Sequence, residues 1–342
     1  MKFKRILSSC LIAAAAINLA ACSRSSMNAD GSEHYTINIT CDASPKTVTG
    51  FCVTEFKRLV EERTDGKVTV YAYTDGAIGS DKEVMEHVRS GSIEMAAMNS
   101  GNQTTDIPAV NVFDMPCIFE NAEVARAAWD EPAFRSLLNS KYEEAGLELL
   151  MLTDQGFRET SSNIPLQTIE DFKGLDIRTM TNDVHIQFWK ALGANPTPMN
   201  RSEVFLALQQ GLLDAQEDPY VSIELNNYAE VQDYICATNH QFHNITMIAN
   251  KEFFDGLPQE YQELIRDVCE EILVSSRKMA DEVAETSLQE MVNDGMEYVE
   301  PNQETHDWMT KVSEEKVWPI VREKAGNDIV DAMLEAAEKA RE

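Results

Sequence analysis

The sequence is poor in positive charge. Its 342 residues carry 29 lysines and arginines against 58 aspartates and glutamates, which gives a formal net charge of -29 at pH 7. Nucleic acid is bound through basic surface, so this balance argues against a nucleic-acid partner. A small anionic ligand remains compatible with it, because salt screens charges beyond about 8 Å and a buried pocket has its own local field.

The sequence also lacks the short motifs of common enzyme classes. It contains no GxSxG, GxxxxGK[ST], HExxH or GxGxxG pattern. His240 and His243 form the best metal-binding fragment, but residues three apart on a strand point to opposite faces. The acidic turn with Asp214, Glu217 and Asp218 could support general acid–base chemistry, although acidic turns are more often capped and solvated. We therefore expect neither an enzyme nor a bound metal or cofactor.

Cysteine is scarce and irregularly spaced. There are seven cysteines and no CxxC pair. Cys10 and Cys22 belong to the N-terminal segment considered next, and the other five are Cys41, Cys52, Cys117, Cys236 and Cys269. This spacing argues against a zinc site and a dense disulfide framework. At most one or two disulfides are possible, with Cys41 and Cys52 the nearest pair, and we expect most of the five to be buried free thiols.

Only one long apolar run is present, at the N-terminus. Three positive residues within the first five precede the apolar stretch 6–21, which is shorter than the ~20 residues of a membrane span and typical of a secretory signal. Its end, Leu19-Ala20-Ala21-Cys22, looks like a lipobox. We expect residues 1–21 to be removed, which changes the charge to -32, Cys22 to carry acyl chains, and residues 22–32 to form a flexible tether. The alternative is an ordinary signal peptide with a chance cysteine.

The rest of the chain alternates strand and helix patterns. Strands are predicted at 35–40, 67–73, 93–98, 148–153, 175–180, 196–199 and 212–216, with two more within 234–250. Helices are predicted at 45–63, 81–90, 123–145, 183–192, 202–210 and 257–294, and again after 304. Repeated βα units indicate an α/β fold with largely parallel sheets. A cleft between two such lobes is a natural ligand site, and the helix 257–294 is long enough to cross both lobes.

Ordered motifs between residues 156 and 219 resemble the solute receptors of TRAP transporters, the DctP-like family. The motifs are GFR (156–158), TSSN (160–163), EDFKGLDIR (170–178), ALGANPTPM (191–199), SEVFLALQQG (202–211) and DAQEDP (214–219). Looser matches at 78–81, 91–94, 230–232 and 257–258 extend the resemblance over nearly the whole mature chain. It implies a two-lobed periplasmic-binding-protein (Venus-flytrap) fold. We expect lobe I to comprise 33–155 and 244–283, and lobe II 156–243 and 284–342.

Two arginines match the family's cationic positions. Arg178 closes a predicted strand, and a guanidinium presents parallel N–H donors that fit a carboxylate. The resemblance implies that Arg178 is the main carboxylate clamp and that Arg158 is the second cationic contact. Arg158 could instead brace Arg178 from behind.

Other positions depart from the family pattern or extend the site. Asp218 stands where the family has asparagine, and an ionised aspartate only accepts hydrogen bonds, so we expect it to face hydroxyls or to pair with a cation. Arg201, where the family commonly has an aromatic residue, is the candidate cation, or it clamps a second acidic group of the ligand. Asp42, Asp81 and Asn99 match polar wall positions of the other lobe.

The resemblance implies capture of a small organic acid for a sodium-coupled transporter with one small and one large membrane subunit. A uronic or aldonic sugar acid is favoured by Asp218, and a C4-dicarboxylate is the alternative if Arg201 binds a second carboxylate. A sensory receptor of the same fold is the competing function. We expect an exported monomer that meets the membrane only through its lipid anchor, at the outer face of the cytoplasmic membrane or in the periplasm.

Overall fold

The computed structural model describes residues 25–27 and 33–342. The predicted signal peptide and the lipidation site at Cys22 lie outside the described residues. Part of the predicted tether is paired with the sheet, because β1 (Ser25–Met27) runs antiparallel to β2 (Glu33–Thr40). Within the described residues no helix is both long enough and apolar enough to cross a bilayer.

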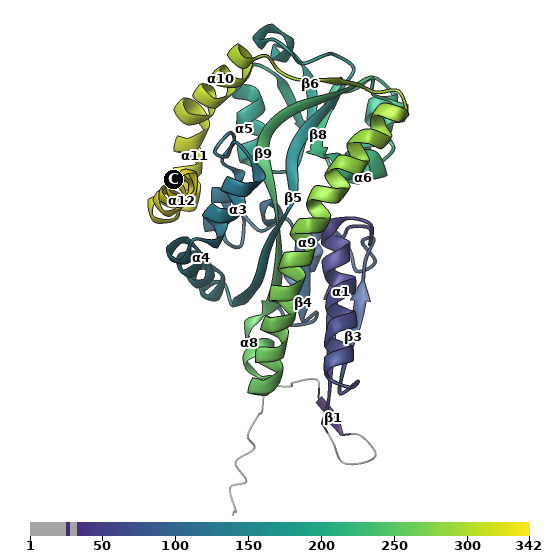
Figure 1. The fold of residues 1–342 in the computed structure, drawn as a ribbon, viewed down its shortest axis with the longest axis vertical. Coiled ribbons are helices and arrows are strands. Elements are labelled where there is room, and N and C mark those ends of the chain that lie inside the picture. Colours follow the sequence, from purple (N-terminus) through teal and green to yellow (C-terminus); the bar gives the residue numbers. More distant parts are fainter. Residues whose placement is uncertain (1–24, 28–32) are drawn as a thin grey trace, which may run out of the picture.

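One mixed sheet connects both halves of the molecule (Figure 1), in the order β1-β2-β4-β9-β5-β8-β6-β7, with β3 beside β2 and β10 beside β9. The remaining strands are β3 (Val68–Tyr73), β4 (Met95–Met98), β5 (Leu147–Ser162), β6 (Asp176–Thr179), β7 (Asn195–Pro198), β8 (Ala215–Pro219), β9 (Tyr234–Asn250) and β10 (Glu297–Val299). The prediction of largely parallel sheets is wrong at the centre, where β9 pairs antiparallel with β4 and β5, and β5 pairs antiparallel with β8.

The two central strands are longer than the sequence pattern indicated. β5 has 16 residues and β9 has 17, and β9 is one strand where two were predicted. Their pairing is interrupted by a bulge between Asp154 and Phe157, opposite Asn244 and Phe242. A bulge bends a strand and increases its twist. The predicted lobe boundaries, 155/156 and 243/244, fall at this bulge, and the division into lobes stays a prediction.

Helices cover both faces of the sheet. They are α1 (Val48–Arg63), α2 (Asp81–Arg89), α3 (Ala122–Asp130), α4 (Pro132–Glu144), α5 (Asp183–Ala191), α6 (Arg201–Gln209), α7 (Tyr220–Leu225), α8 (Lys251–Asp255), α9 (Gln259–Asn293), α10 (Gln303–Val312), α11 (Trp318–Ala325) and α12 (Asn327–Arg341). The predicted helix 123–145 is two helices, because Pro132 cannot continue α3 and instead begins α4, which is capped by Glu131.

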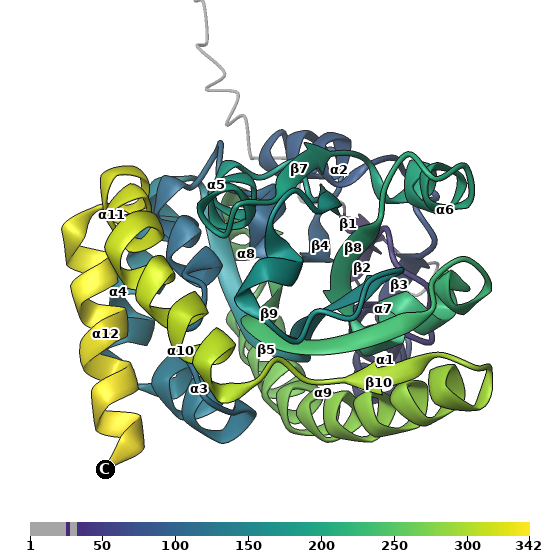
Figure 2. The same cartoon turned by 90° about the horizontal axis from the view of Figure 1, so that it is seen from above.

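The 35-residue helix α9 runs along most of the molecule (Figure 1), and all of its charged residues except the partly buried Arg277 are exposed. It packs against α1 and β5, and farther along against α7, so the prediction that it spans both halves is confirmed. Figure 2 shows α11 and α12 on the side of the molecule away from α6. In the described part of the chain, the five cysteines form no disulfide, and all but the partly exposed Cys117 are buried.

Candidate functional site

Arg178 lies near the end of β6, with its guanidinium buried but without an ionic partner. Its Nε and Nη2 donate hydrogen bonds to the Met199 carbonyl oxygen at 3.0 and 2.8 Å. The residue is 4% exposed, and within residues 33–342 no carboxylate lies within 4.0 Å of it. Burial lowers the pKa of Arg178, and the charges of Asp218 and Glu217 oppose that shift. One edge of this planar cation is therefore fixed by the backbone, and Nη1 has no hydrogen-bond partner in the described structure.

All three guanidinium nitrogens of Arg158, on β5, have polar partners. Its Nε pairs with the Glu217 carboxylate, and its Nη2 donates to the Glu217 carbonyl oxygen at 2.7 Å. Its Nη1 lies 2.8 Å from His243 Nδ1 and 3.3 Å from Asp218 Oδ1. Burial lowers the pKa of Arg158, but Glu217 and Asp218 outweigh it, so the net shift is upward. This geometry ties Arg158 to Glu217 and Asp218, and whether Arg158 contacts the ligand or braces Arg178 stays a prediction.

Glu217 is the centre of a buried polar network behind the site. Besides Arg158, it lies 3.3 Å from His185 Nδ1 and 3.3 Å from His240 Nε2. Burial acts to raise the pKa of Glu217, but Arg158 and the two histidines hold it well below its usual range. A carboxylate at 0% exposure is stable only when its charge is compensated in this way.

His185, on α5, links Glu217 to a second buried carboxylate, that of Asp114. Its Nε2 lies 3.2 Å from Asp114 Oδ1, at the end of the 3₁₀ helix Pro108–Asp114. Asp114 also accepts hydrogen bonds from Asn182 at 2.7 Å and Gln241 at 3.0 Å. Burial opposes protonation of His185, but the bonds to Asp114 and Glu217 raise its pKa to about 9. No group of three or more potential ligands within the described residues is arranged to hold a metal ion.

Asp218 and Arg201 do not pair with each other as the sequence suggested. Asp218 is next to Arg158, whereas Arg201 forms an ion pair with Asp42. Asp42 follows β2 and Arg201 begins α6, so this pair joins two elements separated by 159 positions in the sequence. Asp218 lies 3.3 Å from Arg158 Nη1 instead, because β5 and β8 are neighbouring strands and place the two side chains together, and whether Asp218 faces ligand hydroxyls stays a prediction.

Asp81 and Asn99 lie on the N-terminal side of the site. Asp81 begins α2; its Oδ2 accepts a hydrogen bond from Asn102, and its Oδ1 is buried without a partner. Asn99 caps the short 3₁₀ helix that follows it, because its Oδ1 accepts from the Gly101 amide at 2.8 Å. Its Nδ2 donates to the Asn244 carbonyl oxygen at 2.8 Å. The polar atoms of Asn99 are thus used locally.

Several buried polar atoms near these residues have no hydrogen-bond partner among residues 33–342, although such atoms are normally satisfied in folded proteins. They include Asp81 Oδ1, Ser100 Oγ, Thr179 Oγ1, Tyr228 Oη and Asn244 Nδ2. Burial raises the pKa of Tyr228, with a further contribution from Asp218, while Arg178 and Arg201 oppose the shift. Tyr228 therefore belongs to the same site as the arginines. Sequence reasoning missed it, although it stands two residues before the 230–232 motif.

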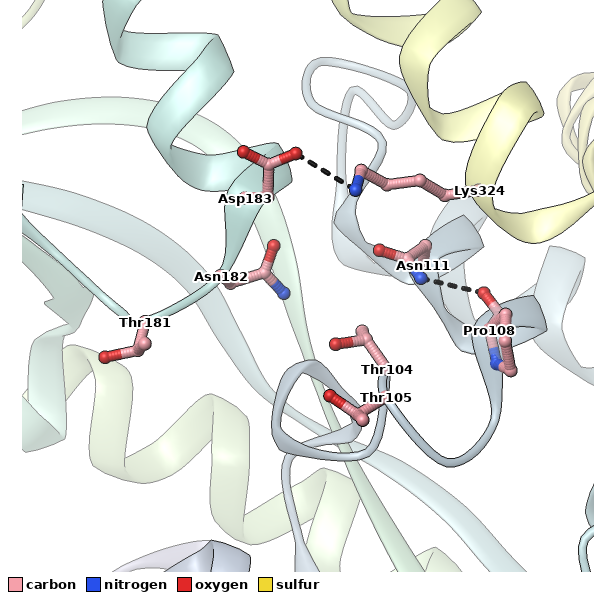
Figure 3. Close-up of a pocket in the computed structure, with 8 residues that line it drawn as sticks. All are labelled: Thr104, Thr105, Pro108, Asn111, Thr181, Asn182, Asp183 and Lys324. Atoms are coloured by element: carbon pink, nitrogen blue, oxygen red, sulfur yellow. Dashed lines mark hydrogen bonds and ion pairs between the residues drawn. The ribbon is translucent and has the colours of Figure 1, made fainter.

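Two surface hollows lie away from Arg178. One, of about 390 Å³, is lined by Thr104, Thr105, Pro108, Asn111, Thr181, Asn182, Asp183 and Lys324. Figure 3 shows the Asp183–Lys324 ion pair at its rim, with an Nζ–Oδ2 distance of 3.0 Å. The other, of about 340 Å³, lies beside Pro108 and α4. Neither hollow holds the unpaired cation or the unsatisfied polar atoms, so charge and hydrogen bonding locate the candidate site better than volume does.

Comparison with known proteins identifies the family. Residues 40–323 match the family model DctP, described as bacterial extracellular solute-binding protein, family 7. The chain belongs to this family. Its members are solute-binding receptors, and Arg178, Arg158 and Asp218 all lie within the matched DctP region.

Named relatives and a solved structure cover most of this chain. The 2,3-diketo-L-gulonate-binding periplasmic protein YiaO of Escherichia coli is 31% identical over 72% of this chain and 75% of its own. The C4-dicarboxylate-binding periplasmic protein DctP of Rhodobacter capsulatus is 33% identical over 74% of this chain and 76% of its own. The sugar acid binding protein DctPAm from Advenella mimigardefordensis, solved in complex with galactonate, has 28% identity and a TM-score of 0.84, covering 90% of this chain and 99% of that chain. These matches confirm the two-lobed α/β fold.

Proposed function

We propose that this DctP-family protein is the extracytoplasmic receptor of a sodium-coupled TRAP transporter and that Arg178 binds the carboxylate of its ligand. The observation that carries the proposal is an arginine that is 4% exposed, whose guanidinium is oriented by the Met199 carbonyl and is free of any ion pair within the described residues. A buried charge without a partner is costly. A ligand carboxylate compensates the charge and takes the free donors in a bidentate pair.

The ligand that fits the rest of the site is a hydroxylated sugar acid, such as a uronate or an aldonate. Asp218, Asp42 and Asp81 offer carboxyl oxygens to hydroxyl groups, and Tyr228 adds a hydroxyl without a partner. One relative is named for binding 2,3-diketo-L-gulonate, and one similar solved structure is of a sugar acid binding protein in complex with galactonate. The alternative is a C4-dicarboxylate, for which the Rhodobacter capsulatus relative is named.

Arg158 and Asp218 then act as a unit at the inner wall of the site. Because Arg158 is bonded to Glu217 on one side and lies 3.3 Å from Asp218 on the other, it fixes the position of the Asp218 carboxylate. Asp218 keeps lone pairs available for ligand hydroxyls. Any direct contact of Arg158 with the ligand would have to be made through Nη1, which is shared with His243 and Asp218.

The location of the receptor and its membrane partners are proposed from its family and its N-terminal sequence. We propose that acylated Cys22 holds a monomer at the outer face of the cytoplasmic membrane or in the periplasm, and that a small and a large membrane subunit receive its ligand. A sensory receptor of the same fold would deliver ligand occupancy to a membrane signalling protein instead. Genes for two membrane subunits next to this one favour transport, and a neighbouring histidine kinase gene favours sensing.

A thermal-shift screen of organic acids tests the receptor function. A ligand at 100 times its dissociation constant stabilises the folded state by about 2.7 kcal/mol, which gives a clear increase in Tm. Recovery of the ligand unchanged after incubation distinguishes a receptor from an enzyme. If no organic acid raises the Tm, or if Arg178→Gln responds as the wild type does, the proposal is wrong.

A further inference from the structure

A group of three charged residues comes from three different elements. Asp42 follows β2, Asp81 begins α2, and Arg201 begins α6. Arg201 is paired with Asp42, and its pKa is raised by Asp42, Asp218 and Asp81 in that order, against the effect of burial, which is the largest single influence. The three residues are therefore close enough to act on one another electrostatically.

Asp81 is the unusual member of the group. Its Oδ2 accepts a hydrogen bond from Asn102, while its Oδ1 is buried and has no partner. The residue as a whole is partly exposed, so one carboxyl oxygen is enclosed while other atoms reach solvent. Burial, and then the charge of Asp42, raise the pKa of Asp81 to about 7, and Arg201 opposes the shift. The buried Cys41 thiol is a further titratable group near Asp81, because the charge of Asp81 raises the pKa of that thiol.

The charges in the site disfavour the binding of a second anionic group. Arg201 is neutralised by Asp42, and Arg158 is neutralised by Glu217. Arg178 is then the one guanidinium of these three without a carboxylate partner in the described structure, and the charges of Asp218 and Glu217 act on it. At Arg201, a second ligand carboxylate would come under the negative charges of Asp42 and Asp218, which disfavours its ionised form.

We propose that Asp42, Asp81 and Arg201 form a second subsite, which receives a hydroxylated, uncharged part of the ligand and excludes a second carboxylate. This inference rests on the proposed receptor function and narrows its ligand to hydroxylated monocarboxylates. In the subsite the paired Asp42 accepts hydrogen bonds from ligand hydroxyls. Asp81 binds in its neutral form, in which Oδ1 can donate a hydrogen bond as well as accept one.

The first test compares two ligands that differ at one end. D-galactonate and galactarate share their hydroxyl pattern, but galactarate has a second carboxylate. By calorimetric titration we expect wild-type protein to bind galactonate at least about 100-fold more tightly, because each unfavourable charge contact of a few kcal/mol changes affinity by more than tenfold. Equal affinities, or a preference for galactarate, would overturn the inference.

The second test releases Arg201. Asp42→Asn leaves Arg201 without its carboxylate partner, so galactarate affinity is expected to rise about tenfold or more relative to galactonate. The double variant Asp42→Asn with Arg201→Gln should lose this gain. Asp106→Asn is the matched control, because it removes the carboxylate of another Arg–Asp pair, Arg89–Asp106, and should leave both affinities unchanged. An Asp42→Asn variant with wild-type selectivity contradicts the proposal.

The third test addresses the protonation of Asp81. Galactonate keeps the same charge at pH 6 and pH 8, so loss of the Asp81 proton over that range is expected to weaken wild-type binding about tenfold. Asp81→Asn should weaken binding about threefold at pH 6, through one altered hydrogen bond, and should flatten the pH profile. A profile that is the same in the variant and the wild type shows that Asp81 is not the titrating group.

Failure of this inference can be told apart from failure of the receptor function. If Arg178→Gln abolishes binding of every acid while wild-type protein binds galactarate as well as galactonate, the receptor function stands and the second subsite is wrong. If Arg178→Gln still binds the acids, the receptor proposal itself fails. If wild-type protein binds neither sugar acid at about 10 mM, far above the Kd of a specific receptor, the narrowed ligand class is wrong.

Discussion

Substitution of the two buried arginines by glutamine is expected to change the free energy of unfolding strongly at Arg158 and little at Arg178. Arg158→Gln leaves the Glu217 carboxylate buried without its guanidinium, and breaking a buried ion pair in this way costs about 3–5 kcal/mol of the free energy of unfolding. Arg178→Gln removes a buried charge that has no ion pair in the described structure, which relieves desolvation. It also removes the hydrogen bonds to the Met199 carbonyl, worth about 1 kcal/mol. These effects oppose each other, so a change within about 1 kcal/mol is expected.

The effect on binding follows from the same geometry. A bidentate carboxylate contact contains two charge-assisted hydrogen bonds, each worth about 1.5–3 kcal/mol, so Arg178→Gln should weaken ligand binding by roughly two to four orders of magnitude. Urea unfolding followed by circular dichroism measures stability, and calorimetric titration with D-galactonate measures affinity. The reasoning is refuted if Arg178→Gln destabilises the fold as much as Arg158→Gln does, or if its affinity stays within about tenfold of wild type.

Three further outcomes are expected. The pKa of His185 is raised from 6.5 to about 9 in the folded state. The protonated imidazole therefore stabilises the fold fully below pH 6.5, and this stabilisation is lost as the pH rises through 9. The Tm should fall between pH 7 and 10, and it should fall less in His185→Gln. Gly50→Ala should cost more than about 2 kcal/mol in urea unfolding, since its Cβ would lie 2.1 Å from the backbone oxygen of residue 44; a change below 0.5 kcal/mol would show that the loop yields easily. Asp154→Asn should cost about 2–3 kcal/mol, because this buried carboxylate accepts two hydrogen bonds from Arg126 at 2.7 and 3.0 Å. Asp281→Asn, at the exposed end of the same arginine, should cost less than about 1 kcal/mol.

The sequence predicted best those elements whose apolar residues follow a regular period. The strand at 35–40, the helix at 81–90 and the long helix from 257 onward match β2, α2 and α9 closely. Each buries an apolar face against the core, which is the property that hydrophobic periodicity reports.

The central strands were predicted poorly because their buried residues are polar. The second half of β5 reads Asp-Gln-Gly-Phe-Arg-Glu-Thr-Ser-Ser, and most of it is buried through hydrogen bonds and ion pairs. The same holds for Gln216, Glu217 and Asp218, which place β8 at Ala215–Pro219, later than the predicted 212–216. Hydropathy cannot identify a buried strand whose side chains are satisfied by one another.

The residues of the candidate site could be proposed from the sequence, but their pairings could not. Arg178 and Arg158 lie in family motifs and both are buried, and their roles toward the ligand stay a prediction. The Asp42–Arg201 pair depends on how β2 and α6 meet in space, and no local pattern contains that information. His243 contacts Arg158, and His240 contacts Glu217, because β5, β8 and β9 bring the three segments together.

The continuous strands β5 and β9 limit how this protein can be divided. Each strand passes through the bulge at Asp154 and Phe157 without leaving the sheet, so no linker separates one half from the other. A fragment cut at the bulge would expose the edges of both strands, which favours aggregation. A chimera made with a relative would also have to preserve the pairing register of both β5 and β9 across the bulge. The two halves are therefore expected to be inherited, expressed and engineered together, as one intact chain.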